Sequence, residues 1–241
     1  MPRFVLLLAF FFTLTLSSGW AQRPVVPRAL PPNPYAPVED VSGLPRVLLI
    51  GDSISEGYTV PVRKLLQGKA NVHRIPENGG ATKAGLAKIE KWLGTEKWDV
   101  IHFNWGLHDL MFDPTTHPDP AQYEKDQLAQ YEKNLRTLTA RLKETGAKLI
   151  WASSTPVADE MSSPRSPSHR AHMVPVYNEV AAKIMAENGI PIDDLNAYVT
   201  PVEDKMRKHH DVHFSMEGSE FLAIKVAEEI AKALPPPGEK R

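Results

Sequence analysis

Short apolar runs alternate with longer stretches of helical period from Arg46 onward, and this alternation constrains the fold more than any other feature of the chain. The apolar runs predict strands at Val47–Ile50, Asn71–Ile75, Val100–Phe103, Leu149–Ala152 and Ile190–Ile192. The stretches between them predict helices at Pro61–Gln67, Ala84–Leu93, Pro120–Thr145 and Val174–Asn188, with a last helix from the N-cap Ser215 to Leu234. Because such alternation is typical of βαβ units, we expect an α/β fold, a three-layer αβα sandwich around a parallel sheet.

The composition excludes some classes of protein. The chain has 241 residues, which suits one domain with a substantial core, and a formal net charge of −1. That charge provides no electrostatic footprint for binding nucleic acid. Because the sequence contains no Cys, the fold has no disulfides and depends on its core alone.

The N-terminal residues have the features of a secretory signal peptide. Arg3 supplies a positive charge, Phe4–Leu16 is apolar, and Gly19-Trp20-Ala21 matches a cleavage signal, so we expect residues 1–21 to be removed. The apolar run is too short to span a bilayer comfortably, and no Cys follows it to accept a lipid. These features favour a secreted or periplasmic protein over one with a stable membrane anchor.

Two further segments flank the expected domain. Residues 22–44 are dense in Pro, which disfavours both helix and central strand, so we expect a semi-rigid extended linker. Residues 236–241 form a polar tail after the last helix. The domain itself is expected at residues 45–235.

The loops that follow the strands form the candidate site, because ligands of such sheets bind beyond the carboxyl ends of the strands. The first loop contains Gly51-Asp52-Ser53, the second has the paired glycines of PENGGATKAGL, and the third is NWGLHDL. The segment KHHDVHFSMEG before the last helix places His213 at the same edge of the sheet. Taken singly, these are common turn residues or a buried histidine, but their order along the chain indicates one composite site.

In this order, the motifs resemble the SGNH subgroup of the GDSL esterase and lipase family over nearly all of residues 46–234. GDSIS is similar to the family's first block, NGGAT to the second, GLHD to the third and DVHFS to the fifth. The resemblance implies a flavodoxin-like sandwich with a five-stranded parallel sheet, in agreement with the periodicity. It also implies Ser53 as nucleophile, Gly80 as the second-block glycine and His213 as general base.

The chemistry of ester hydrolysis explains these residue types. A serine hydroxyl is a poor nucleophile at neutral pH, so Ser53 needs a base, and His213 would take its proton and later return it to the leaving alcohol. The oxyanion of the tetrahedral intermediate needs hydrogen-bond donors that are already in place. The resemblance implies Ser53 N–H, Gly80 N–H and a side chain of the third block as these donors.

The third block departs from the family's pattern, because His108 stands where the family has Asn. An imidazole N–H can donate one hydrogen bond as an amide does, provided that the other ring nitrogen fixes the tautomer. We therefore predict that His108 is the third oxyanion donor. The alternative is that His108 only braces its loop.

The acid that orients the general base also departs from the pattern. The family has Asp three residues before the catalytic His, but His210 occupies that position and the nearest acid, Asp211, lies two residues before His213. In an extended segment, these two offsets point to different sides. Three possibilities remain: a local bulge that brings Asp211 to His213, a Ser53–His213 dyad with a backbone carbonyl holding the imidazole, or an acid from elsewhere.

Other residues near these blocks are candidates for binding. Trp105, in the third loop, is expected to line the acyl or sugar pocket, and Asn78 either braces the second loop or contacts the substrate. His209, His210, Asp211 and His213 suit zinc by residue type, but neighbours in an extended segment face alternately, so we expect no metal site.

We therefore expect an exported serine esterase that hydrolyses carboxylic esters through an acyl-enzyme and needs no cofactor. Export and the lack of an apolar lid segment favour an acylated carbohydrate or other acylated small molecule, with deacetylation of carbohydrate foremost. A lysophospholipase or thioesterase is the alternative within this class. A carbohydrate-binding protein that has lost catalysis is the alternative of another class, because two blocks depart from the family's pattern.

Overall fold

The computed structural model describes residues 33–113, 119–158, 168–208 and 211–236. The expected signal peptide and the end of the expected polar tail lie outside these residues. Among the helices of the described residues, none is long and apolar enough to cross a membrane.

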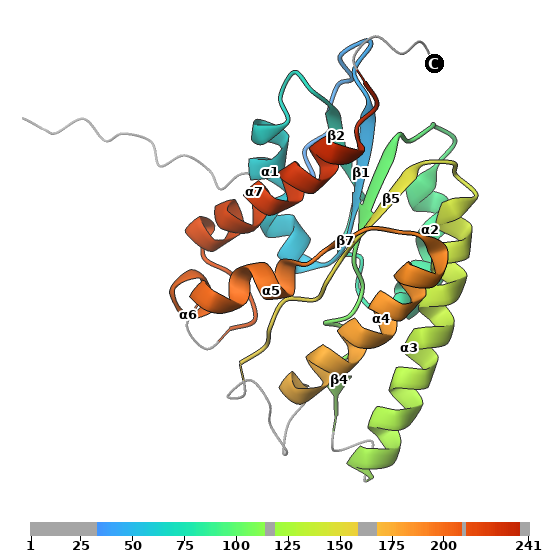
Figure 1. The fold of residues 1–241 in the computed structure, drawn as a ribbon, viewed down its shortest axis with the longest axis vertical. Helices are drawn as coiled ribbons and strands as arrows, with labels where there is room; N and C mark the ends of the chain where they lie inside the picture. The colour runs from blue at the N-terminus through green and yellow to red at the C-terminus, as the bar shows by residue number, and fades with distance from the viewer. Residues whose placement is uncertain (1–32, 114–118, 159–167, 209–210, 237–241) are drawn as a thin grey trace, which may run out of the picture. The chain divides into compact units, whose positions relative to one another are not determined.

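A sheet of five parallel strands forms the centre of the fold, in the order β2-β1-β3-β5-β7 (Figure 1). The strands are β1 (Arg46–Ile50), β2 (Asn71–Arg74), β3 (Val100–Phe103), β5 (Lys148–Ala152) and β7 (Ile192–Asp193). Chain order reverses beside β1, whose neighbours are β2 on one side and β3 on the other. The loops after β1 and β3 therefore meet at a topological switch point, where open α/β sheets bind their ligands.

Helices cover both faces of the sheet, as expected for a three-layer sandwich (Figure 1). One layer contains α1 (Ser53–Leu65), α5 (Leu195–Val199) and α7 (Met216–Ala233), and the other contains α2 (Thr82–Leu93), α3 (Pro120–Lys143) and α4 (Val174–Asn188). The short helix α6 (Glu203–Met206) packs on α7. Because both faces are covered, every residue of β3 is buried, and so are the last four residues of β1 and β5.

The first helix begins at Ser53 and not at Pro61, where the sequence predicted its start. Proline is favoured in the first turn of a helix, which is why Pro61 suggested a beginning there. The side chain of Asp52 determines the actual start, because its Oδ1 accepts a hydrogen bond from Ile54 N at 3.0 Å and so caps the helix. Ser53 is thereby the first helical residue instead of part of a long loop.

Several short elements were not predicted. Strands β4 (Met111–Phe112) and β6 (Ser168–His169) form an antiparallel pair outside the main sheet. Helices α5 and α6 and the 3₁₀ turns Ala171–Met173 and Thr200–Val202 are also new. Elements of two to five residues contain too little periodicity for a pattern to identify them.

A segment that we call the N-terminal strap, residues 33–45, lies along the edge strand β2. Asn71 accepts a hydrogen bond from Val41 N at 2.9 Å and donates one to Val41 O at 3.1 Å. Asp40 Oδ1 lies 2.6 Å from His73 Nε2. The described part of the expected Pro-rich linker is therefore bound to the domain, and it belongs to the same compact unit as the sheet.

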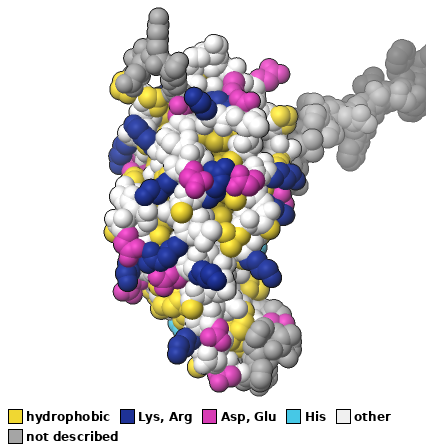
Figure 2. Space-filling model, turned by 90° about the vertical axis from the view of Figure 1, so that its right-hand side faces the viewer, with side chains coloured by type: hydrophobic (Ala, Val, Ile, Leu, Met, Phe, Trp, Pro, Cys, Tyr) yellow, Lys and Arg dark blue, Asp and Glu magenta, His cyan; other side chains and the backbone are white. Residues whose placement is uncertain are grey.

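The surface over α2, α3 and α4 mixes acidic and basic side chains, as the face shown in Figure 2 illustrates. Arg141 of α3 pairs with Glu90 of α2 at 2.6 Å, and Arg136 pairs with Glu187 of α4 at 2.5 Å. These pairs of opposite charges connect neighbouring helices. Paired charges cancel, in agreement with the net charge of −1.

Candidate active site

The turn after β1 places Ser53 at the carboxyl edge of the sheet. Ser53 is half-buried and is the first residue of α1, with Asp52 as its N-cap. The first N–H groups of a helix have no acceptor within the helix and carry its positive partial charge. Ser53 N–H is therefore suited to stabilise negative charge that develops beside its own hydroxyl.

His213, which follows α6, meets Ser53 across 160 positions of sequence. His213 Nε2 lies 2.7 Å from Ser53 Oγ, and His213 Nδ1 lies 2.6 Å from Asp211 Oδ1. An imidazole between a hydroxyl and a carboxylate is the arrangement of a Ser-His-Asp triad. Of the three possibilities for the orienting acid, this geometry corresponds to Asp211 reaching His213 through a local bend.

The bend explains how an acid two residues away faces the imidazole. Residues 211–213 are not a strand, and Asp211 Oδ1 also accepts a hydrogen bond from His213 N at 3.2 Å. One carboxylate oxygen thus binds both the backbone and the ring of the same histidine, as in an Asx-turn. Partial burial opposes ionisation of Asp211, but the hydrogen bonds from His213 lower the pKa of this carboxyl below its usual value.

The second loop touches the nucleophile turn directly. Gly79 N donates a hydrogen bond to Gly51 O at 2.9 Å, and a Cβ on Gly79 would lie only 2.8 Å from that oxygen. Only glycine permits this approach. Gly80, with φ of 56°, has the left-handed backbone that turns the chain into α2.

Gly80 and Asn78 are joined by a hydrogen bond within the second loop. Gly80 N–H donates to Asn78 Oδ1 at 2.9 Å, so this predicted oxyanion donor is engaged by a protein acceptor. Asn78 Nδ2 in turn donates to Glu56 Oε1 at 2.9 Å. With both ends of its amide bound, Asn78 braces the second loop.

The third loop contains His108 and Asp109. His108 is exposed. Burial raises the pKa of the nearby Asp52 carboxyl, and the proximity of His108 opposes that rise. Asp109 accepts hydrogen bonds from Thr82 N at 3.0 Å and Thr82 Oγ1 at 2.5 Å, so it ties the third loop to the start of α2. Burial raises the pKa of Asp109 to about 6 despite these bonds.

Trp105 is fully buried, contrary to the expectation that it lines the acyl or sugar pocket. Its side chain is 0% exposed, and its indole lies against Gly85 of α2, where a Cβ would approach within 2.9 Å. Trp105 Nε1 donates to Gly79 O at 3.4 Å. The indole therefore supports the second loop from beneath, because a hydrophobic ring of this size is most stable when removed from water.

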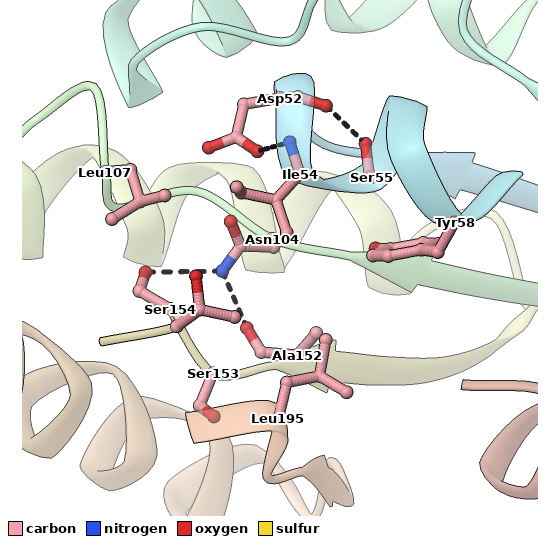
Figure 3. A pocket seen from close by; sticks show the side chains of 11 residues that line it. Asp52, Ile54, Ser55, Tyr58, Asn104, Leu107, Ala152, Ser153, Ser154 and Leu195 are labelled. Carbon is pink, nitrogen blue, oxygen red and sulfur yellow. Dashed lines mark hydrogen bonds between the residues drawn. The ribbon is translucent and has the colours of Figure 1, made fainter. Parts of the chain in front are cut away.

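Figure 3 shows the space beneath the nucleophile turn, bounded by α1 above and by the ends of β3 and β5 below. Asp52 and Ser55 lie on one side of it, and Asn104 donates to Ala152 O at 2.7 Å on the other. The cavity measures about 10 Å³, which is room for about one water molecule. An acyl chain has no room in this cavity, and Ser53 is not among the residues that line it.

Among the described residues, no group of three or more His, Cys, Asp or Glu side chains could hold a metal ion. His209 and His210, which belong to the cluster considered above, lie outside those residues. Sequence reasoning overlooked Arg74 and Glu56, whose side chains lie behind Ser53. The strand that Arg74 ends, NVHR, is polar at three of its four positions and gives no signal that this arginine turns inward.

The model of the GDSL-like lipase/acylhydrolase family matches residues 49–221. Among solved structures, the lipase/acylhydrolase from Enterococcus faecalis superposes with a TM-score of 0.64 at 23% identity, covering 82% of this chain and 100% of that one. The acetyl xylan esterase AlAXEase gives 0.61 at 16% identity, covering 77% and 99%. Axe2, an acetylxylan esterase from Geobacillus stearothermophilus, gives 0.60 at 21% identity, covering 77% and 94%. The comparison with curated proteins found no match.

At these identities, the solved structures show a shared fold. The family model covers most of the chain, and its span contains the turn of Ser53, the second and third loops and the bend of His213. The chain therefore belongs to the GDSL-like lipase/acylhydrolase family and is a carboxylic ester hydrolase.

Proposed function

We propose that the protein is an exported serine esterase that removes acetyl or another short acyl group from carbohydrate through an acyl-enzyme on Ser53. The observation that carries this proposal is the continuous contact from Asp211 through His213 to Ser53 Oγ. The features of residues 1–21 support export.

The geometry supports an acyl-transfer mechanism. His213 Nε2 takes the proton as Ser53 Oγ attacks the ester carbonyl, and Asp211 stabilises the imidazolium. Collapse of the tetrahedral intermediate breaks the ester C–O bond, and His213 returns the proton to the leaving alcohol. Water, activated by the same imidazole, then attacks the acyl-enzyme, which releases the carboxylic acid and restores Ser53.

Negative charge on the intermediate needs donors at the same edge of the sheet. Ser53 N–H is one, and the ring of the exposed His108 is the second. Gly80 N–H becomes a third only if it exchanges Asn78 Oδ1 for the oxyanion. The complete set of donors thus depends on a movement of one side chain in the second loop.

The structural neighbours support a short acyl group on carbohydrate. Two of the structural neighbours named above are described as esterases of acetylated xylan. The proposed substrate is therefore an acetyl ester of a carbohydrate.

A fluorophosphonate probe tests the nucleophile, because it reacts with activated serines. We expect the wild-type protein to be labelled and the Ser53→Ala variant to remain unlabelled. If the wild-type protein stays unlabelled, a carbohydrate-binding protein without catalysis replaces this proposal.

A series of p-nitrophenyl esters of increasing chain length, assayed beside acetylated xylan and other acetylated glycans, tests the substrate. We expect kcat/KM to be highest for acetate and to fall with chain length, and acetate to be released from at least one glycan. A maximum at long acyl chains would instead favour a lysophospholipase or thioesterase.

A further inference from the structure

A buried arginine lies directly behind the nucleophile turn. Arg74, the last residue of β2, has a side chain that is 0% exposed. Its Nη1 donates to Ser55 Oγ at 2.5 Å, and its Nη2 donates to Gly51 O at 3.1 Å and to Asp52 O at 3.2 Å. One guanidinium thus binds residues on both sides of Ser53.

The same acceptors connect this arginine to the rest of the turn. Ser55 Oγ donates to Asp52 O at 2.7 Å, and Gly51 O also accepts the hydrogen bond from Gly79 of the second loop. A shift of Arg74 would therefore loosen two carbonyls of the nucleophile turn together. Such a shift matters because Ser53 Oγ must stay within hydrogen-bond reach of His213.

The charge of Arg74 is balanced from the surface side by Glu56 and the N-terminal strap. Glu56 Oε1 lies 3.6 Å from Arg74 Nη2, and Tyr35 OH donates to the same carboxylate at 2.5 Å. The Tyr35 ring also lies 5.4 Å from the guanidinium carbon, within the range of a cation–π contact. Glu56 additionally receives the hydrogen bond from Asn78, so the second loop shares this support.

We propose that Arg74 is a positioning residue for the nucleophile, and that Tyr35 of the N-terminal strap holds the Arg74–Glu56 pair in place from outside. The inference rests on the proposed role of Ser53. Lysine cannot replace Arg74, because an ammonium is a point charge and lacks the planar set of donors that reaches three acceptors at once. The N-terminal strap thereby contributes to the positioning of Ser53.

The variant Arg74→Lys tests this role against a matched control, Arg63→Lys. Arg63 lies on α1 and binds Val72 O of β2 at 3.0 Å through its Nε, so it is also an arginine between α1 and β2. For Arg74→Lys, we expect kcat and the rate of fluorophosphonate labelling to fall about 10- to 100-fold with KM unchanged, because a small displacement of reacting atoms costs rate and not binding. Arg63→Lys should leave all three unchanged.

The melting temperatures of both variants separate positioning from general destabilisation. The assays are run well below both melting temperatures, so that a fall in kcat does not come from unfolding. If Arg74→Lys keeps the wild-type kcat and labelling rate, the inference is wrong while the proposed function stands. If the wild-type protein is not labelled at Ser53, the proposed function itself fails.

Tyr35→Phe provides a milder second test of the strap. It removes the hydroxyl that binds Glu56 and keeps the ring beside Arg74. We expect kcat to fall by about two- to fivefold, less than the full value of a hydrogen bond to a charged group, because Tyr35 acts on Ser53 only through the Arg74–Glu56 pair. We expect no further fall when the change is added to Arg74→Lys. Independent, multiplicative losses in the double variant would overturn the coupling between Tyr35 and Arg74.

Discussion

The two halves of the active site are held in different ways. The turn that carries Ser53 is fixed from several elements, by Arg74 of β2, Gly79 of the second loop and the cap of α1. Asp211 and His213 lie on a bend where their side chains are 37% and 39% exposed, and the Asp211 carboxylate binds both the ring and the backbone N–H of His213. The nucleophile is thus positioned by tertiary structure, and the acid–base pair by a local turn.

This difference explains which departures from the family's pattern the fold accepts. A local Asx-turn carries its own geometry, so an acid at a new offset can still reach the imidazole if the chain bends around it. The nucleophile turn has no such freedom, because Gly51 O and Asp52 O are shared acceptors of Arg74 and their positions depend on β2. Variation is therefore expected on the histidine side before the serine side.

The largest effect is expected on the histidine side, from Asp211→Asn. An amide cannot hold the imidazole in the correct tautomer or stabilise the imidazolium, so kcat should fall about 10³- to 10⁴-fold. The exposed position of this pair predicts little change in melting temperature. Turnover of p-nitrophenyl acetate provides the measurement, and a loss of less than about tenfold would show that Asp211 is not the orienting acid.

The third loop provides the next test, because its donor is a side chain. Removing the ring in His108→Ala should lower kcat by about 100- to 1,000-fold, the usual cost of losing one oxyanion donor. His108→Asn restores an N–H donor and should keep most of the activity. An alanine variant with wild-type turnover would contradict the role of His108 and leave it as a residue that only braces its loop.

The sequence predicted features that depend on local periodicity and missed those that depend on caps or on the direction of single side chains. The strands and long helices were predictable because their periodicity is local, and α4 was predicted at its observed bounds, Val174–Asn188. The start of α1 was not, because the cap at Asp52 competes with the signal of Pro61. The contact of Asp211 with His213 was left open, because the direction of a side chain in a bend depends on backbone angles that residue types do not specify.

The supports of Ser53 were beyond sequence reasoning for another reason. Arg74 and Glu56 act through contacts between residues 18 or more positions apart, and nothing in NVHRIP shows that an arginine turns inward. Trp105 was misjudged for the same reason, because its place in a loop of the candidate site gave no indication that α2 covers it. A single sequence does not show which residues of different helices, strands and loops are in contact.

The second loop offers a test on the serine side through Asn78→Asp. The carboxylate has the same shape as the amide, but it would bind Gly80 N–H more firmly and oppose negative charge on the intermediate. It would also repel the Glu56 carboxylate, which now accepts a hydrogen bond from Asn78. We expect kcat to fall about tenfold with KM unchanged. If steady-state kinetics show no loss, the exchange of Gly80 N–H between Asn78 and the oxyanion is not part of catalysis.

The smallest effect on rate, and a measurable one on stability, is expected at Asp109, which joins the second and third loops. Its pKa is about 6 in the folded protein against an ordinary value of 3.8, so the folded state binds this proton more readily than the unfolded state. The stabilisation from this group is therefore fully present below about pH 3.8 and is lost as the pH rises through about 6, to a limit of about 3 kcal/mol. Asp109→Asn retains an acceptor for Thr82 and cannot ionise, so its free energy of unfolding, relative to wild type, should increase between pH 4 and pH 7. Urea unfolding of both proteins across that range measures the difference. A difference independent of pH would show that Asp109 has the same pKa in the folded and unfolded states, and that its burial between the loops does not hold the proton.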